Sequence, residues 1–416
     1  MGVNLPWQTV EPLPPTLFAQ IRHRTIFECC KWDPQVEDVS TLCPFPLILN
    51  HADWQEISLL AEELASETMA IEAELVAKPS LHKQLSFPRS IRKIFEQVSE
   101  SKPSAGSARI MRFDFHFTTH GWKISEANTD VPGGFVEASG FTSLISEQYP
   151  GTSFSSPADM LADAMAETAR EHRIVALVHA TAFTDDRQVM VFLAKKLEHR
   201  GIQAVLVAPD HLRWANGKAS VASDWFNGPV DFVFRFFPAE WLPNLPRRCD
   251  WFHFFHGSET PLCNPATALL TQSKRLPIVW NQLATKAPAW RRLLPETAAL
   301  SQVDWSNERD WVLKPALGRV GESIGLYGAT DEKEWKSIRK AARRDPDEWI
   351  AQRRFEPVPL FLNNEKTFPC IGVYTIDGRA AGAYGRISSN GLINHRAQDI
   401  AVLVANPSKQ QQQLVA

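Results

Sequence analysis

The sequence is poor in the features that mark several common classes of protein. Its six cysteines form no Cys-x-x-Cys pair, so we expect reduced thiols in a cytoplasmic protein and no structural zinc. No charged-then-apolar leader and no apolar run of membrane-spanning length occurs in the 416 residues. We therefore expect no membrane partner. The length of the chain predicts two or three domains.

An excess of one charge is also missing, because the formal net charge is only −3. Nucleic-acid-binding domains carry a basic patch or stripe, and so we expect no nucleic-acid partner. Neither the G-x-G-x-x-G nor the G-x-x-x-x-G-K-[ST] pattern occurs, which excludes a Rossmann or P-loop nucleotide site. The 14 tryptophans have no interleaved basic residues, so we interpret them as packing residues.

The most informative stretch opens with a strict alternation of aromatic and polar side chains. Successive side chains of a strand point to opposite faces of its sheet. The three phenylalanines between residues 113 and 117 therefore share one face, and Arg112, Asp114 and His116 share the other. On that face His116 would either support a ligand or touch a substrate, or simply pack against its neighbours.

A second short strand, residues 122–128, would supply partners for this polar face. It carries Glu126 and Asn128 two residues apart. Together with Asp114 they form a set of hard oxygen ligands suited to Mg²⁺, and Arg112 adds a guanidinium beside them. A surface hairpin whose charges are merely solvated is the alternative interpretation.

The hairpin can assemble this set in only one register. Glu126 lies opposite Asp114 if the loop around residues 119–121 contains an odd number of residues. A loop with an even number of residues would put the polar side chains of the two strands on opposite faces of the sheet. We therefore predict an odd loop or a bulge, with Gly121 as the left-handed residue.

The flanking regions alternate helical and strand patterns. Helices are predicted over residues 53–78 and 90–100, behind a proline-rich and irregular N-terminus. Residues 174–208 show strand, helix and strand in turn, and they predict a small α/β domain. Asp185 and Asp186 follow its first strand, where they would either cap the helix or bind a ligand.

Two lysines and a glycine-rich segment characterise the C-terminal half. Residues 266–283 have a helical pattern that carries Lys274, and a predicted strand over 311–315 contains Lys314 near its end. The glycines between 318 and 325 could lay backbone N–H groups over phosphates, or could be ordinary turns. Further strands are predicted over 349–353 and in a hairpin over 369–386.

These signals together describe one kind of chemistry. Two lysines on separate elements and a glycine-rich flap would hold a polyphosphate, while a metal ion would neutralise the charge of a departing phosphoryl group. None of them is decisive alone, so their order along the chain matters.

In that order, the motifs resemble the synthetase domain of the glutathionylspermidine synthase family, whose members are ATP-grasp carboxylate–amine ligases. The resemblance covers residues 108–400 and includes no room for the amidase domain of some members. The shared motifs are R-x-D at 112–114, E-x-N at 126–128, a lysine helix at 273–280, K-P-x-x-G-R-x-G-x-x-I at 314–324, a glutamine strand at 350–352 and a late arginine, Arg386.

The resemblance implies an α/β (α+β) ATP-grasp fold in circularly permuted order, because the acidic hairpin precedes the lysines. A small pre-ATP-grasp-like domain would accompany it. The implied parts are an N-terminal packing region at 1–105, the metal hairpin and part of the core at 106–165, the small α/β domain at 166–255, the lysine and flap region at 256–405, and a disordered tail at 406–416.

The same resemblance implies the site and the reaction. ATP and two Mg²⁺ ions would turn a small-molecule acid into an acyl phosphate, which an amine converts to an amide. The implied roles are metal ligation by Asp114, Glu126 and Asn128, transition-state stabilisation by Arg112, ATP binding by Lys274, Lys314, Gly318, Gly321 and the backbone near Gln352, and contacts to phosphates or acid by Arg319 and Arg386.

The chain departs from the family pattern at the implied substrate end. Ser273 replaces the usual Asn before the lysine, and the segments after Asn128 and Arg386 lack residues typical of relatives. The acid and the amine, including glutathione or a polyamine, are therefore left open, as is the oligomeric state. Alternatives are a peptide ligase of a specialised pathway with an unrelated or carrier-bound acid, and a catalytically silent nucleotide-binding scaffold.

Overall fold

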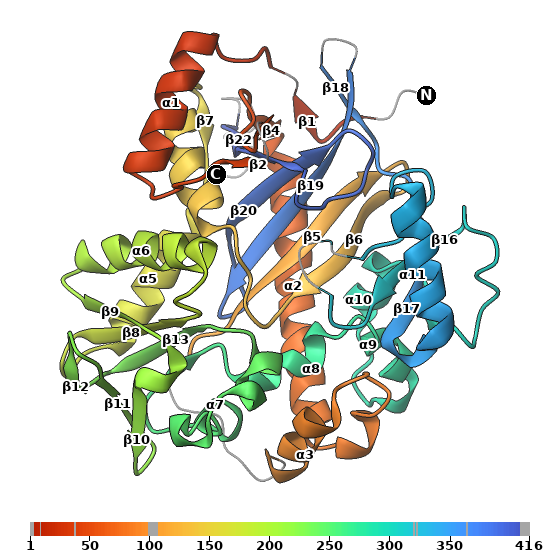
Figure 1. Ribbon diagram of the computed structural model, residues 1–416. Helices are drawn as coiled ribbons and strands as arrows, with labels where there is room; N and C mark the ends of the chain where they lie inside the picture. The colour runs from red at the N-terminus through yellow and green to blue at the C-terminus, as the bar shows by residue number, and fades with distance from the viewer. Residues whose placement is uncertain are drawn as a thin grey trace.

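The computed structural model describes residues 4–8, 10–36, 39–98, 107–318, 321, 323–362 and 365–407. This part of the chain is a mixed α/β structure, as predicted. The long helix α2 (His51–Val76) packs against one face of the central sheet and runs through the middle of Figure 1. The tail predicted to be disordered, residues 406–416, lies outside the described residues from residue 408 onward.

The central sheet joins strands from both halves of the chain. Its antiparallel order is β21-β20-β19-β5-β6, and Figure 1 shows the early pair β5 and β6 beside the late pair β19 and β20. The bounds are Ile110–Thr118 for β5, Gly121–Asn128 for β6, Glu365–Ile376 for β19, Arg379–Ser388 for β20 and Gln398–Ile400 for β21, with β18 (Leu360–Leu362) pairing the start of β19.

The β5–β6 hairpin has the register that the predicted metal set requires. Glu126 lies opposite Asp114, and the second predicted pair lies two residues further along each strand. The turn contains two residues and would by itself give the wrong register, but a bulge at Ser125 corrects it. Gly121 has a φ of 85°. The predicted bulge and left-handed glycine are thus confirmed.

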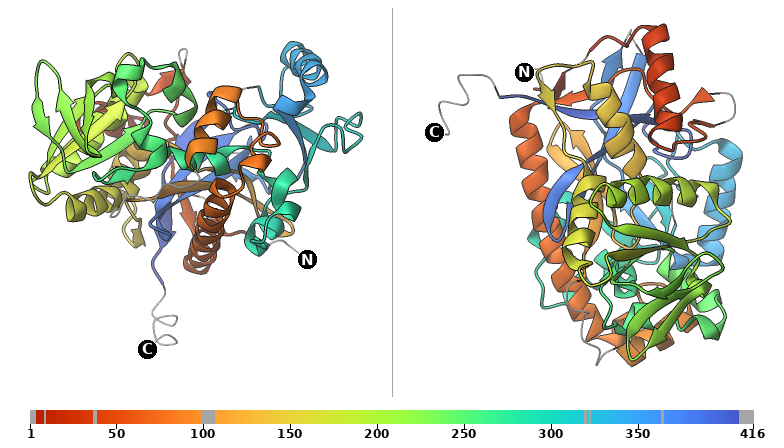
Figure 2. Two further views of the ribbon diagram at one scale, coloured as in Figure 1. Left: turned by 90° about the horizontal axis from the view of Figure 1, so that it is seen from below. Right: turned by 90° about the vertical axis from the view of Figure 1, so that its left-hand side faces the viewer.

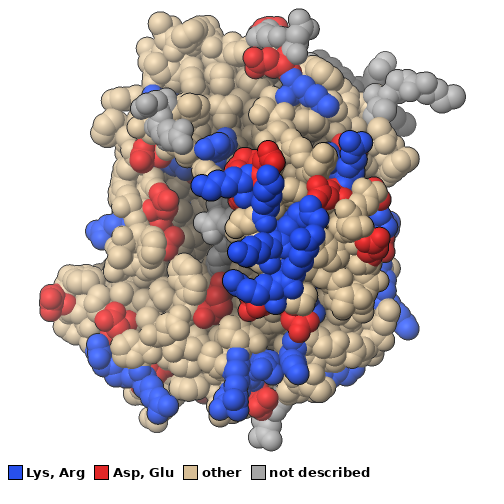
Figure 3. All heavy atoms as spheres, turned by 45° about the vertical axis from the view of Figure 1, so that its right-hand side comes forward, with Lys and Arg blue, Asp and Glu red and all other residues tan. Residues whose placement is uncertain are grey.

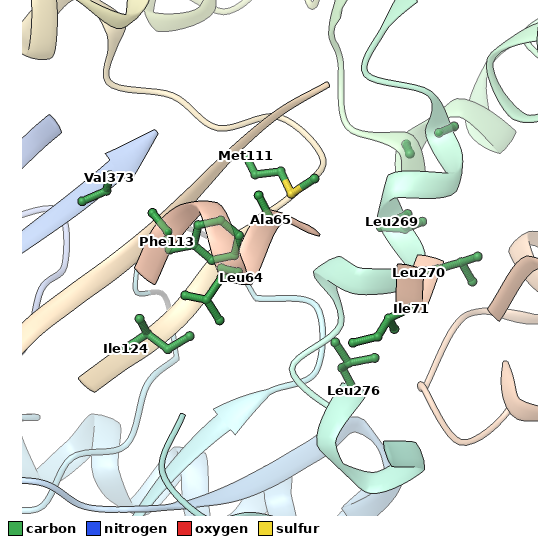
Figure 4. Close-up of a cluster of buried hydrophobic side chains, with 14 of the residues drawn as sticks. Leu64, Ala65, Ile71, Met111, Phe113, Ile124, Leu269, Leu270, Leu276 and Val373 are labelled. Atoms are coloured by element: carbon green, nitrogen blue, oxygen red, sulfur yellow. The ribbon is translucent and has the colours of Figure 1, made fainter. Parts of the chain in front are cut away.

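The aromatic face of β5 forms the core against α2. Phe113 and Phe115 are completely buried. Figure 4 shows Phe113 packed among Leu64 and Ala65 of α2 and Val373 of β19. Because this face is committed to the core, the opposite face of the same strand turns its polar side chains to the other side of the sheet.

A second sheet carries Lys314 and is called the lysine sheet. It consists of β15 (Thr297–Ala299), β17 (Trp349–Arg353) and β16 (Trp311–Pro315), in that antiparallel order. The helix α11 (Glu332–Arg344) buries Trp335 against it. The outer side of α11 contributes to the positive charge visible in Figure 3 through Lys333, Lys336, Lys340, Arg343 and Arg344.

The continuous helix predicted over residues 266–283 is wrong. Helix α8 (Leu269–Gln272) and helix α9 (Leu276–Val279) are separated by a break that contains Lys274. A proline in the first turn of α9 favours a new helix start there. At the break the backbone N–H of Lys274 donates to the carbonyl of Ala316 at 2.9 Å, which fixes the lysine beside the end of β16.

The predicted small α/β unit contains a parallel sheet in the order β14-β13-β8-β9. Figure 2 shows this unit and α11 on opposite sides of the central sheet. Neither Asp185 nor Asp186 caps α6, because Phe183 takes that position and both aspartates lie in the first turn. The bounds are Ile174–His179 for β8, Thr184–Glu198 for α6, Gln203–Val207 for β9, Phe232–Phe236 for β13 and Leu262–Cys263 for β14, with β10 (Leu212–Ala215), β11 (Lys218–Ala222) and β12 (Asn227–Pro229) beside them.

The N-terminal region is integrated into the fold. Strand β4 (Leu47–Leu49) lies parallel to β22 (Val402–Ala405) in a small sheet with β1 (Trp7–Gln8) and β7 (Thr152–Ser153). No helix in the described ranges combines the length and apolarity needed to cross a membrane. The remaining elements are α1 (Pro15–Phe27), β2 (Gln35–Val36), β3 (Val39–Ser40), α3 (Arg89–Val98), α4 (Thr142–Ser146), α5 (Pro157–Thr168), α7 (His253–His256) and α10 (Pro288–Leu293).

Candidate active site

A cavity of about 370 Å³ lies between the polar face of the central sheet and the lysine sheet. Its walls come from β5, β6, β19 and β20 on one side, and from β16, β17 and residues 353–357 on the other. Arg319 lies outside the described residues. The predicted site residues that line the cavity are Arg112, Asp114, Glu126, Asn128, Lys314, Gly321, Gln352 and Arg386.

Arg112 and Asp114 form a two-pronged ion pair along β5. The guanidinium Nε and Nη2 donate to the two carboxylate oxygens at 2.7 and 3.1 Å. Asn128 donates its Nδ2 to Asp114 at 3.2 Å, and Arg112 Nη1 donates to the carbonyl of Gly133 at 2.7 Å. The alternation of β5 and the bulge of β6 together bring these groups onto one surface.

Glu126 lies between two lysines from other parts of the chain. Its Oε2 is 3.3 Å from Nζ of Lys274, which the break between α8 and α9 positions. Lys314, on β16, donates from Nζ to the carbonyl of Ser125 at 3.0 Å. The bulge therefore serves two purposes, because it sets the hairpin register and also presents the Ser125 carbonyl to a buried ammonium group.

The close approach of these charges alters their acidity. Burial lowers the pKa of Lys314 to about 8, an effect that Glu126 partly opposes and Lys274 reinforces. Burial alone would raise the pKa of Glu126, but Lys274, Lys314 and Arg112 together lower it. At neutral pH the cavity thus contains an ionised Glu126, and a Lys314 whose charge is lost in mild alkali.

His116 shares the polar face of β5 and lines the same cavity. Its Nε2 is 3.1 Å from the hydroxyl oxygen of Ser125, and its ring lies 5.2 Å from the ring of Phe355. Burial and the charge of Lys314 lower its pKa to about 4, so the ring is neutral at pH 7. This histidine therefore holds the bulged serine without adding charge.

The oxygens of Asp114, Glu126 and Asn128 fit a magnesium ion. They comprise two carboxylates and one amide, which are hard ligands, and they project from adjacent strands into one cavity. Arg112 and Lys274 pair with the carboxylates. An arriving dication would take over part of that pairing.

The glycine-rich segment after β16 contains Gly318 and Gly321, and Gly321 lines the cavity. Nζ of Lys274 donates to the carbonyl of Gly318 at 2.6 Å. Gly321 has a φ of 69° and lies so close to the carbonyl of Ile393 that a Cβ atom would clash with it. Only glycine combines this backbone conformation with this approach.

The predicted Arg386 lines the cavity together with Tyr384, and Tyr374 lies beside Arg112; sequence reasoning missed the two tyrosines. The guanidinium carbon of Arg112 lies 5.2 and 5.9 Å from the ring centres of Tyr384 and Tyr374. Tyr384 is followed two residues later by Arg386, so both side chains leave β20 on the same face. The chain has only four tyrosines, and two of them on the predicted hairpin over 369–386 were an available signal.

Gln352 lines the other side of the cavity, on β17. Its side chain is buried, and Nε2 donates to the hydroxyl of Thr297 at 3.1 Å. The residues that follow it, from Arg353 to Pro357, line the cavity and connect the lysine sheet to β18.

A fully buried ion pair anchors the loop after Asn128, and sequence reasoning missed it as well. Arg235 of β13 donates from Nη2 to Asp130 at 2.5 Å, and both side chains are 0% exposed. Arg235 also donates to the carbonyls of Asn264 and Phe237. An arginine within an apolar strand was the signal, because such a group requires a buried partner.

The sequence is similar to known proteins over most of its length. The profile described as glutathionylspermidine synthase preATP-grasp matches residues 46–404. A Haemophilus influenzae protein provisionally named an acid–amine ligase is 23% identical over 281 residues, which is 65% of this chain and 68% of that protein.

A solved structure extends the likeness to the whole fold. The glutathione synthetase-like effector of Globodera pallida, in its apo form, superposes with a TM-score of 0.64. The match covers 94% of this chain and 98% of the other, at 15% identity. At that identity the likeness concerns the fold alone, and it agrees with the permuted ATP-grasp architecture that the motifs predicted.

Proposed function

Because this chain belongs to the glutathionylspermidine synthase family, we propose that it is an ATP-dependent ligase that joins a carboxylic acid to an amine. The acid–amine class is supported by the family and by the Haemophilus influenzae relative. The use of ATP and Mg²⁺, and an acyl-phosphate intermediate, are the finer parts of the proposal.

The observation that carries the proposal is the convergence of opposite charges in one cavity. Two carboxylates, an amide, Lys314 and two arginines from β5, β6, β16 and β20 line the cavity, and Lys274 from the α8–α9 break lies 3.3 Å from Glu126. A polyphosphate needs cations, and its metal needs oxygen ligands. A surface hairpin with solvated charges would not bury such a set, and Arg112 and Asp114 are each only 12% exposed.

In the first half-reaction, a carboxylate oxygen of the acid attacks the γ-phosphorus of ATP. A new oxygen–phosphorus bond forms, the bond to the β-phosphate breaks, and ADP leaves with the electron pair. Lys274 and Lys314 would hold the phosphates, and Arg112 would stabilise the charge on the transferring group. Asp114, Glu126 and Asn128 would hold Mg²⁺, which supplies charge neutralisation.

In the second half-reaction, the neutral amine attacks the carbonyl carbon of the acyl phosphate. The carbon–nitrogen bond forms, inorganic phosphate leaves with the electron pair of the old carbon–oxygen bond, and this phosphate accepts the proton that the amine loses. Arg112 and Arg386 would stabilise the phosphate as it departs. The segment around Gly318 and Gly321 would exclude water, which would otherwise hydrolyse the acyl phosphate.

The test measures ADP release from Mg²⁺-ATP with a panel of carboxylic acids, each with and without polyamines and amino acids. Release that requires both an acid and an amine supports the ligase and identifies its substrates. The Arg112→Lys variant keeps the charge beside Asp114 but loses the two-pronged guanidinium, and it should be strongly impaired. Arg379→Lys, at a side chain that is 81% exposed, is the matched control and should behave as wild type.

Two other outcomes separate the alternatives. Tight Mg²⁺-ATP binding without release for any pair across the panel favours the nucleotide-binding scaffold. No binding of Mg²⁺-ATP would contradict the proposal altogether.

A further inference from the structure

We propose that Lys31, in the N-terminal region, is a positioning residue that keeps Arg386 available to an anion in the cavity. Lys31 acts through the carboxylates of Glu137 and Asp399 and does not line the cavity itself. The inference rests on the proposed function, because it assigns Arg386 an anionic substrate group or phosphate to bind.

Lys31 is held in place from several sides. It follows α1, and its backbone N–H donates to the carbonyl of Thr25 at 3.1 Å. The N–H of the next residue, Trp32, donates to the side chain of Gln188 on α6 at 2.8 Å. The ammonium group therefore enters the protein along a fixed path, and its side chain is only 18% exposed.

The ammonium group of Lys31 reaches two buried carboxylates. It forms a short ion pair with Glu137, which lies in a π-helical turn over Val136–Phe141, and its Nζ is 3.9 Å from Oδ2 of Asp399. Turns of this kind are rare and occur often at functional sites. Glu137 and Asp399 are only 10% and 7% exposed, so neither charge is relieved by water.

Asp399 connects this pair to the cavity. Its Oδ1 accepts a hydrogen bond from the hydroxyl of Tyr384 at 2.6 Å, and the same oxygen is 4.0 Å from Nε of Arg386. Among the described residues, Nε of Arg386 is buried without a hydrogen-bond partner. Its Nη2 donates to the carbonyl of Asn394. Arg386 thus lies next to a carboxylate without forming the close, two-pronged pair that these groups normally prefer.

Charge balance explains why the close pair does not form. Lys31 and Arg386 provide two positive charges, and Glu137 and Asp399 provide two negative ones. Without Lys31, two buried carboxylates would share a single guanidinium, and at low dielectric the attraction between Asp399 and Arg386 would dominate. Arg386 would then turn toward Asp399 and away from the cavity.

The same movement would reach Arg112. Tyr384 connects the two arginines, because its hydroxyl binds Asp399 and its ring lies 5.2 Å from the guanidinium carbon of Arg112. Gly134 packs so closely on this ring that a Cβ atom there would clash with it. A shift of Asp399 would therefore act first on Tyr384 and the two arginines at the anion-binding end, whereas the two cavity lysines contact β6.

The test measures binding of inorganic phosphate to the full-length protein saturated with Mg²⁺-ADP, by titration calorimetry. Phosphate is the smallest anion that the two arginines would hold. Lys31→Met should weaken phosphate binding by about tenfold to a hundredfold, the range expected for losing a charged hydrogen bond. The affinity for Mg²⁺-ADP itself should stay as in wild type.

Two further variants exclude a merely structural effect. Lys31→Arg keeps the positive charge and should retain phosphate binding. Combining Lys31→Met with Asp399→Asn removes the competing carboxylate and should restore it, an outcome that damage to packing would not produce. Lys218→Met, on the small α/β unit, removes an exposed lysine as the matched control.

The failures can be told apart. A wild-type protein that binds neither Mg²⁺-ADP nor phosphate contradicts the proposed function. Wild-type binding of both, with Lys31→Met unchanged or with no recovery in the double variant, overturns the role of Lys31. If Lys31→Met alone does not fold, the comparison of the double variant with Asp399→Asn decides, because the proposal requires both to bind phosphate.

Discussion

The charge of Lys314 makes nucleotide binding depend on pH in a way that can be worked out in advance. In the proposed role the group would bind phosphates only as an ammonium ion, and burial lowers its pKa to about 8 in the free protein. A polyphosphate nearby favours the charged form, so binding raises this pKa again. Above pH 8 the free protein must therefore gain a proton in order to bind.

The magnitude follows from the protonated fraction. With a pKa of about 8, about 90% of Lys314 is charged at pH 7 and about 10% at pH 9. The apparent dissociation constant of Mg²⁺-ATP varies inversely with the competent fraction, so it should rise about tenfold between these pH values. Over this interval His116 stays neutral, because its pKa is lowered to about 4.

The assay is a fluorescence or calorimetric titration with Mg²⁺-ATP at half-unit steps from pH 7 to pH 9.5. Lys314→Arg is the matched variant, since a guanidinium keeps its charge throughout and should give a flat profile. A flat wild-type profile would refute the reasoning, as would a slope that persists in Lys314→Arg.

Three further predictions concern single side chains. Asn128→Ala removes an uncharged ligand and leaves the ion pairs intact. The Mg²⁺ concentration needed for half-maximal ADP release should therefore rise about tenfold or more. An unchanged Mg²⁺ requirement would exclude Asn128 from the metal site. Asp130→Ala leaves Arg235 buried without its carboxylate partner. The free energy of unfolding, measured by urea titration, should fall by about 3–5 kcal/mol. A loss below about 1 kcal/mol would mean that water reaches the arginine. Gly321→Ala introduces a Cβ where the backbone has a positive φ and a carbonyl lies in contact. The apparent KM for ATP should therefore rise, while the melting temperature changes little. Wild-type kinetics would show that the segment need not close.

The β5–β6 hairpin and its register could be predicted because the information is local. Alternation decides which face Asp114 occupies, and the hydrophobic requirement of the core decides the register with Glu126. Because the turn has two residues, this register requires a bulge in one strand, and the structure has it at Ser125. A short-range pattern with one admissible solution is the kind of feature that a sequence specifies.

The helix predicted over residues 266–283 shows the opposite case. Its apolar spacing fits a helix, yet the structure breaks it at Lys274, where the backbone N–H bonds to Ala316 instead of to the preceding turn. That bond joins residues 42 positions apart (316 − 274), and helical periodicity carries no information about it. The network of Lys31, Glu137 and Asp399 was missed for the same reason, since its members meet only in the folded chain.

The strand order of the central sheet also has a consequence for how the protein forms. Strand β5 pairs with β19, so that Asp114 finds its neighbour at Gly372. Closing so long a loop costs conformational entropy before any contact repays it, and such distant pairings slow folding. A ribosome releases residues in order, so a nascent chain displays Phe113 and Phe115 long before their partner strand exists. The growing polypeptide cannot complete this cavity, and the edge of β5 that pairs with β19 stays open to other strands until almost the whole chain has emerged.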